Sequence, residues 1–209
     1  MCNDFYNKAE KIECEVTNMN KNILLIHGFN GITPIFYYFK KELEAQGYNV
    51  IIPEFPVREK ININEYFKVL DIYKEIINEN LIVIAHSLGN SMFIKYICKH
   101  NLKAGLYISL AGFAEAFYVE GKDVLNKVIE PLTISSEEKA KIINLIDEKY
   151  SIYSDNDHIV PFKTLKEYSL TINSKPIFIP GIGHMGKTSG LKSLPQVVEI
   201  IKSNSVKEM

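Results

Sequence analysis

Cysteine, net charge and long apolar runs are all scarce in the 209-residue sequence. The three cysteines, Cys2, Cys14 and Cys98, are widely spaced and contain no CxxC pair, so we expect reduced thiols in a cytoplasmic protein. A net charge of -1 predicts no polybasic surface, which argues against nucleic acid or anionic membrane as a partner. No apolar stretch reaches the about 20 residues of a membrane-spanning helix, and the polar N-terminus does not resemble a signal peptide.

Metal and dinucleotide motifs are also missing. There is no HExxH, no HxH and no Cys/His cluster, so we expect no metal. Gly181, Gly183 and Gly186 do form a G-x-G-x-x-G pattern after an apolar run. The chain ends too soon after it for another strand to complete a dinucleotide-binding unit, and we therefore expect no cofactor.

The hydrophobic content is 46%, which is enough for a full core and argues against disorder. We expect one domain over residues 22–209. Residues 1–21 are mostly polar, with Ile12, Cys14 and Val16 alternating, and they read equally well as a loose arm or a short edge strand. Nothing in the sequence indicates the oligomeric state.

Apolar strand-like runs alternate with helical patterns along the chain. The runs occupy 22–27, 49–55, 81–85, 106–110, 149–154 and 175–180. Alternation of this kind predicts an α/β fold, with a mostly parallel sheet of about six strands and helices on both faces. Thr33, Asn64 and Ser135 are the expected N-caps of three of the helices.

Polar clusters follow the predicted strands. They read HGFNG, AHSLG, DNDHIVP and GIGHMG. Because the carboxyl ends of parallel strands share one edge of a sheet, where such folds place their chemistry, these clusters are expected to meet.

The second cluster places Ser87 between a strand and a helix. A serine at the tip of such a turn is held in a strained conformation that exposes its hydroxyl. Ala85 and Gly89 are small, as the close approach of strand and helix requires, although the usual pattern has glycine where Ala85 stands. Taken alone, the motif could equally be a surface turn.

A serine hydroxyl needs a base to take its proton, and the base needs an orienting acid. His184, in the loop after the last strand, is the expected base, and the chain order Ser, Asp, His is that of α/β-hydrolases. Asp157 is preferred as the acid because it opens D-x-x-V-P, while Asp155 competes. His27 is expected to buttress the first loop, and His86 to point away from the base.

The oxyanion that forms during acyl transfer needs two backbone N–H donors. The expected donors are the N–H groups of Leu88, which follows the serine at a helix N-terminus, and Phe29 in the first loop. Phe113, Phe117 and Tyr118 fall in 111–134, where the strand–helix rhythm breaks. They either form the rim of the substrate pocket or cover the core.

The segments IHGF, IAHSLG, LAGFAE, SDNDHIVPF and GIGH occur in the order found in α/β-hydrolases. With them, residues 22–205 resemble the small serine hydrolases related to retinoblastoma-binding protein 9 and the bacterial YdeN-like proteins. The resemblance implies a three-layer fold with little or no lid and hydrolysis of small esters, or of amides. The alternative is an inert protein of the same fold that serves as a binding module.

Overall fold

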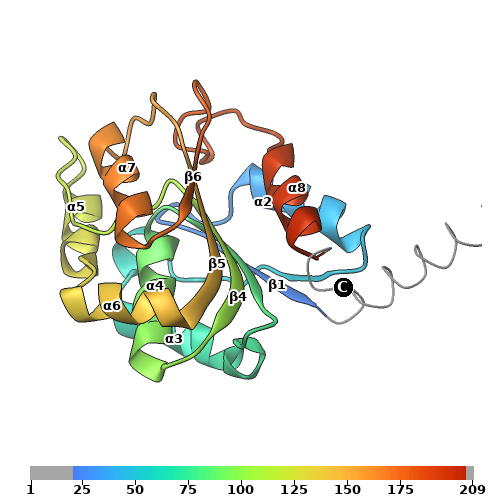
Figure 1. Cartoon of the computed structure of the whole chain (residues 1–209). Coiled ribbons are helices and arrows are strands. Elements are labelled where there is room, and N and C mark those ends of the chain that lie inside the picture. The colour runs from blue at the N-terminus through green and yellow to red at the C-terminus, as the bar shows by residue number, and fades with distance from the viewer. Residues whose placement is uncertain (1–20, 206–209) are drawn as a thin grey trace, which may run out of the picture.

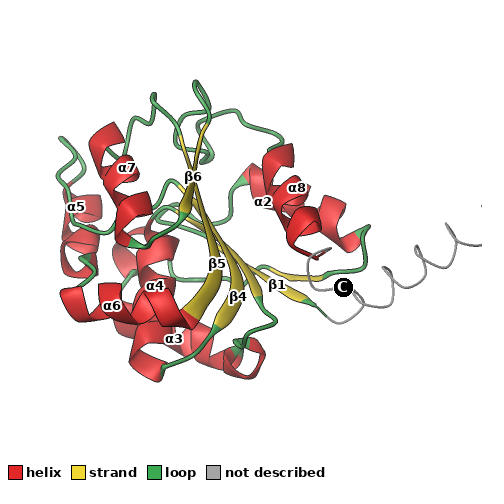
Figure 2. Ribbon diagram, in the orientation of Figure 1, coloured by secondary structure: helices red, strands yellow, loops and turns green. Residues whose placement is uncertain are grey.

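Six strands form one sheet in which every neighbouring pair is parallel (Figures 1 and 2). The strands are β1 (Asn22–Ile26), β2 (Asn49–Ile51), β3 (Ile82–His86), β4 (Ala104–Leu110), β5 (Ile146–Tyr153) and β6 (Lys175–Phe178), and their order across the sheet is β2-β1-β3-β4-β5-β6. This is a computed structural model, and it describes residues 21–205. The predicted arm or edge strand at 1–21 therefore lies, apart from Lys21, outside the described residues.

The central strands are apolar on both faces, because helices cover both sides of the sheet. Every residue of β3 is buried, and β1 is buried from Ile23 onward. Such strands lack the alternation of a half-exposed sheet, which is why they appear in the sequence as continuous apolar runs. The edge strand β2 is shorter than the predicted 49–55 and pairs only with β1.

Two layers of helices enclose the sheet (Figure 1). Helices α2 (Pro34–Glu44) and α8 (Pro195–Ser205) pack together on one side, and α3 (Ile63–Ile72), α4 (Leu88–His100), α6 (Ser136–Leu145) and α7 (Phe162–Thr171) cover the other. The chain moves outward from β1 to β2 through α2 and then returns past β1 to β3 through α3. Right-handed crossovers in opposite directions place their helices on opposite faces, which explains the three layers.

The helix caps follow the predictions in part. Ser135 and Glu138 form the predicted capping box at α6. Thr33 stands at the N-cap of α2, but its buried hydroxyl makes no cap bond. The prediction of Asn64 for α3 was wrong, since the Asn62 side chain accepts the Glu65 N–H at 3.0 Å. Asn64 lies inside the first turn, where a side chain cannot reach back over the free N–H groups.

Residues 111–134 contain only the short helix α5 (Asp123–Ile129) and the 3₁₀ turn η3 (Glu130–Leu132). Two other 3₁₀ turns, η1 (Arg58–Lys60) and η2 (Lys74–Ile76), flank α3. The segment 111–134 packs through α5 against η1. No helix among residues 21–205 combines the length and the apolar character that crossing a membrane requires.

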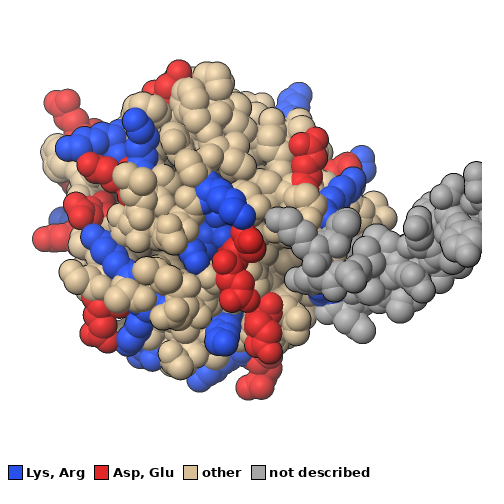
Figure 3. Space-filling model, viewed as in Figure 1, with Lys and Arg blue, Asp and Glu red and all other residues tan. Residues whose placement is uncertain are grey.

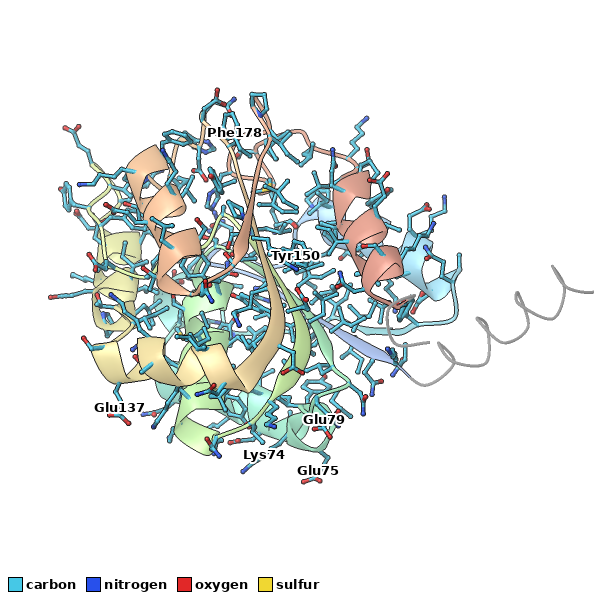
Figure 4. The ribbon with its side chains drawn as sticks, viewed as in Figure 1. Lys74, Glu75, Glu79, Glu137, Tyr150 and Phe178 are labelled. Atoms are coloured by element: carbon cyan, nitrogen blue, oxygen red, sulfur yellow. The ribbon has the colours of Figure 1, made fainter. Side chains whose placement is uncertain are left out.

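The sheet has two ends that differ in character. The "site end" is where the strands finish, near Phe178 at the top of Figure 4, and the "opposite end" is where most of them begin, near Lys74, Glu75 and Glu79. Acidic and basic side chains are interspersed over the face in Figure 3, which carries no large field of one sign. The polar clusters predicted to meet all follow β1, β3, β5 and β6 at the site end.

Candidate active site

Ser87 stands at the tip of the turn between β3 and α4, in a conformation that serine rarely adopts. Its φ is 54° and its ψ is −129°. Gly89 makes this turn possible, because a Cβ at that position would lie 2.7 Å from the His27 oxygen and 2.8 Å from the Ile26 oxygen. Ala85, which replaces the usual first glycine, is fully buried inside β3. The extra methyl group is therefore accommodated within the core.

The Ser87 hydroxyl lies beside the imidazole of His184. Ser87 Oγ and His184 Nε2 are 3.1 Å apart, although the two residues are 97 positions apart in the chain. His184 Nδ1 lies 2.8 Å from Asp157 Oδ2. A carboxylate only accepts hydrogen bonds, so Nδ1 carries the proton and Nε2 is left with the lone pair that a hydroxyl proton needs.

The structure places Asp157, not Asp155, against the predicted base. Asp157 has a side chain only 1% exposed, and its Oδ1 accepts the N–H groups of Ile159 at 2.8 Å and Val160 at 2.9 Å. Burial alone would raise the pKa of this carboxyl, but the hydrogen bond and charge of His184, with the two N–H donors, outweigh it and lower the pKa. Asp157 is thus held as a carboxylate.

Asp155 has a different contact. Its exposed carboxylate accepts the Gly181 N–H at 2.9 Å, and this bond lowers its pKa.

The neighbours of Asp155 bind the same loop. The side-chain oxygens of Ser154 and Asn156 accept the N–H groups of Ile182 at 3.1 Å and Gly183 at 2.7 Å, respectively. The run 154–156 after β5 therefore holds the loop that presents His184. The sequence offered only one signal for this role, a cluster of short polar side chains between two glycine-containing loops.

The loop after β1 passes directly over the serine. A Cβ on Gly28 would lie 2.9 Å from Ser87 Cβ, so only glycine fits there. The Gly28 oxygen accepts two bonds, from His27 Nδ1 at 3.0 Å and from the Gly31 N–H at 3.1 Å. The C=O and N–H of one planar peptide point in opposite directions, so the Phe29 N–H is directed away from these donors.

His27 confirms the prediction that it buttresses this loop. Its Nε2 accepts the Phe55 N–H at 3.1 Å, which leaves Nδ1 as the N–H donor to Gly28. Burial lowers the pKa of His27 and keeps it neutral, as this arrangement requires. The hydroxyl of Tyr66 adds a bond to the His27 oxygen at 2.6 Å.

Leu88 is the first residue of α4, so its N–H has no acceptor within the helix. Asn90 fixes the same turn from inside, donating to the Ser87 oxygen at 2.8 Å and the Leu110 oxygen at 3.2 Å. Neither the Leu88 N–H nor the Phe29 N–H has a backbone acceptor within the described range 21–205. Their role as oxyanion donors stays a prediction.

His86 does not point away from the base loop, so that prediction was wrong. Its ring centroid lies 4.9 Å from that of His184, and its Nε2 lies 2.7 Å from the His184 main-chain oxygen. The prediction rested on His86 being the variable residue of the turn. It could not include the return of the 181–186 loop over the end of the strand.

The three predicted rim residues lie in different surroundings. Phe113 is 1% exposed and packs edge-on against Phe117, while Tyr118 is 72% exposed. A cavity of about 480 Å³ opens between η1, α3, α4 and α5. Its apolar lining comes from Ile61, Ile63, Met92, Val124, Val128 and Pro131. The aromatic residues are not part of this lining, and their contact with substrate stays a prediction.

No group of His, Cys, Asp and Glu side chains among residues 21–205 has the arrangement of a metal site. The polar groups at the site end are instead paired with one another, as a nucleophile, a base and an acid would be.

Comparison with known proteins agrees with this geometry. The model of a family described as Serine hydrolase matches residues 23–203. The chain belongs to the serine hydrolase family. It is 27% identical over 194 residues to YdeN of Bacillus subtilis (strain 168), provisionally described as a hydrolase, with 91% of this chain and 99% of that protein covered.

Solved structures show the same fold. The crystal structure of the B. subtilis ydeN gene product has a TM-score of 0.76 and 26% identity, covering 88% of this chain and 98% of that one. A carboxylesterase structure from the thaumarchaeon Nitrososphaera gargenis has a TM-score of 0.70 at 14% identity, covering 91% and 93%. The latter likeness shows the fold alone. The predicted α/β-hydrolase fold is confirmed, and the protein is a YdeN-like hydrolase.

Proposed function

We propose that this hydrolase cleaves small esters through an acyl-enzyme formed on Ser87. The observation that carries the proposal is the continuous path Ser87 Oγ–His184 Nε2 at 3.1 Å and His184 Nδ1–Asp157 Oδ2 at 2.8 Å. This is the arrangement that turns a serine hydroxyl into a nucleophile, because each group is within reach of the proton that it must hold or pass on.

The reaction has two halves. Ser87 attacks the ester carbonyl while His184 Nε2 takes the hydroxyl proton, and the Asp157 carboxylate stabilises the imidazolium that forms. His184 then gives the proton to the departing alkoxide, which leaves as an alcohol. In the second half His184 removes a proton from water, the resulting hydroxide attacks the acyl-enzyme, and Ser87 recovers its proton as the acid is released.

Backbone donors complete the proposed site. The N–H groups of Phe29 and Leu88 would bind the carbonyl oxygen as it becomes negative. His27 holds the Gly28–Phe29 peptide, and Asn90 holds the Ser87–Leu88 peptide, so both donors are oriented before substrate arrives. Loss of one such donor typically lowers the rate by about 100- to 1000-fold.

The apolar cavity is the proposed site of the acyl chain. One wall begins at Glu59, just after Arg58, whose N–H is bonded to the Phe29 oxygen at 3.0 Å. The opposite wall includes Met92, one turn beyond Leu88 on the same face of α4. Each wall is thus continuous with one proposed oxyanion donor. An ester is favoured over an amide because an alkoxide leaves more easily than an amine.

The test is labelling by a fluorophosphonate probe, which reacts only with an activated serine, followed by intact-mass measurement. We expect one label on the wild type, none on Ser87→Ala, and very slow labelling of His184→Ala. A wild type that is folded by circular dichroism but takes no label would favour the inert binding module. Labelling of Ser87→Ala at the wild-type rate would place the nucleophile elsewhere.

A further inference from the structure

His86 is a buried imidazole to which the proposed reaction assigns no step. It precedes Ser87 at the end of β3 and is 4% exposed. Its Nε2 lies 2.7 Å from the main-chain oxygen of His184. A carbonyl oxygen only accepts, so Nε2 carries the proton and donates, and Nδ1 holds the lone pair.

The same ring touches all three segments that build the site. Through its own backbone it adjoins the nucleophile, and through Nε2 it holds the base loop. Its Nδ1 would lie 3.5 Å from a Cβ on Gly28, in the oxyanion loop, and has no hydrogen-bond partner among the described residues. The ring therefore fills the space where the loops after β1, β3 and β6 converge.

Burial and the nearby His184 lower the pKa of His86 to about 3. The ring thus stays neutral at the pH values at which hydrolases work. Its one ring proton is on Nε2, which therefore remains a hydrogen-bond donor. A charged ring would repel the imidazolium that the proposed reaction forms on His184.

The bond acts on a strained part of the base loop. The His184 oxygen belongs to the peptide that joins His184 to Met185, and Met185 has a φ of 55. A methionine in this region is held there by its surroundings. Asp157 contacts the ring of His184, whereas His86 contacts its main chain.

We propose that His86 is a positioning residue, which ties the base loop to the nucleophile turn and so keeps His184 Nε2 within reach of Ser87 Oγ. The proposal rests on the proposed function, because it assigns His86 a role in the same reaction. It differs from the triad itself in that His86 touches no reacting atom.

The test compares two substitutions of similar size. His86→Gln keeps an N–H donor close to the position of Nε2, whereas His86→Phe keeps the ring and removes the donor. We expect His86→Phe to lower kcat and the fluorophosphonate labelling rate about 10- to 100-fold with KM unchanged, as for other outer partners that orient a reacting group. His86→Gln should recover most of this loss. Thermal unfolding of both variants reports the structural cost separately.

NMR of the wild-type protein with ¹⁵N in its histidine rings gives a second measurement, which depends on neither variant and on no turnover. The ¹⁵N shifts should show His86 as the Nε2–H tautomer, with its Nε2–H coupled across the bond to the His184 carbonyl. The Nδ1–H tautomer would overturn the proposal, and so would equal labelling rates of wild type and folded His86→Phe. Equal losses in the Gln and Phe variants would also overturn it, since packing alone would then explain them. If the wild type showed the predicted tautomer but took no fluorophosphonate label, the proposed function would be wrong instead.

Discussion

The site end and the opposite end of the sheet use different residues where the backbone turns left-handed. Glycines aside, these residues at the opposite end are Asn101 and Asn173, with φ of 53° for both. At the site end they are Arg58, Ser87, Ala111 and Met185, with φ of 54, 54, 48 and 55. Asparagine tolerates this region because its short side chain bonds locally, whereas the other four residues have no such compensation.

Different hydrogen bonds hold the left-handed residues at the two ends. Asn101 ends α4 in a local cap, its N–H bonded to the Ile97 oxygen. Ser87 and Ala111 instead donate to the oxygens of Leu110 at 2.9 Å and Ile152 at 3.0 Å, on neighbouring strands. The opposite end is shaped by local sequence, and the site end is shaped by the sheet. Strain of about 1 to 3 kcal/mol per residue is held where the chemistry is proposed to occur.

The largest test of this comparison is Ser87→Gly. We expect fluorophosphonate labelling and hydrolysis to fall by on the order of 10⁶-fold, as when a serine nucleophile is removed. Stability should rise by about 1 kcal/mol, because glycine relieves the strain of the turn. The matched control, Asn101→Gly at the opposite end, should leave labelling intact and the melting temperature nearly unchanged. A melting temperature of Ser87→Gly below that of the wild type would show that the turn is not strained.

The next effect separates the two aspartates that follow β5. Asp157→Asn should reduce kcat about 10⁴-fold, because the amide favours the wrong tautomer of His184. Asp155→Asn should change kcat only a few-fold, since Asp155 contacts the Gly181 N–H and not the imidazole. Single-turnover labelling rates of the two variants measure the contrast. Equal rates for Asp157→Asn and the wild type would transfer the acid role away from Asp157.

The space around a glycine differs between the two ends of the sheet. At Gly89, near Ser87, an added Cβ would meet backbone oxygens at 2.7 and 2.8 Å, whereas at Gly47, at the opposite end, it would meet nothing within 4 Å. We expect Gly89→Ala to cost about 1 to 3 kcal/mol and to slow labelling. Gly47→Ala, whose φ of +88 is the only objection, should cost about 1 kcal/mol and leave labelling unchanged. Urea denaturation with parallel labelling measures both, and slower labelling of Gly47→Ala would contradict the comparison.

Acid stability offers a smaller test at His86. Because its pKa is lowered to about 3 in the folded protein, the unfolded chain takes up a proton first as the pH falls below the ordinary histidine pKa of 6.5. Stability therefore falls with pH in that window, by up to about 1.4 kcal/mol per pH unit from this one group. His86→Phe should show a shallower fall between pH 6.5 and 3. His184, Asp157 and His27 interact with His86 through their charges, so the difference in slope reports the titration of His86 together with its effect on these neighbours.

The smallest effect concerns the cavity beside α5. Val128→Phe should fill it and reduce kcat/KM for p-nitrophenyl octanoate about 10-fold or more while sparing the acetate, because the long chain loses its apolar surroundings. Phe117→Ala tests the predicted aromatic rim in the same assay. A chain-length preference that changes in Phe117→Ala but not in Val128→Phe would move the acyl site to the rim.

Much of this protein followed from local patterns in its sequence. Continuous apolar runs predicted the parallel sheet, because strands covered on both faces need no polar alternation. The positions of Ser87, Asp157 and His184 after three of the strands predicted their meeting, because parallel strands end at one edge. The capping box of Ser135 followed from residues within one turn of each other.

The remaining features depended on contacts between distant segments. Asp155 and Asp157 stand two positions apart and carry the same carboxylate, and the path of the 181–186 loop places Asp157 against His184 and Asp155 against Gly181. The same loop brings the His184 oxygen to His86, which was expected to point away from the base. Sequence alone thus determined which chemical groups reach the site end, since that depends on local periodicity. Only the tertiary structure decided which groups pair there, because hydrogen bonding depends on distances between loops that are far apart in the chain.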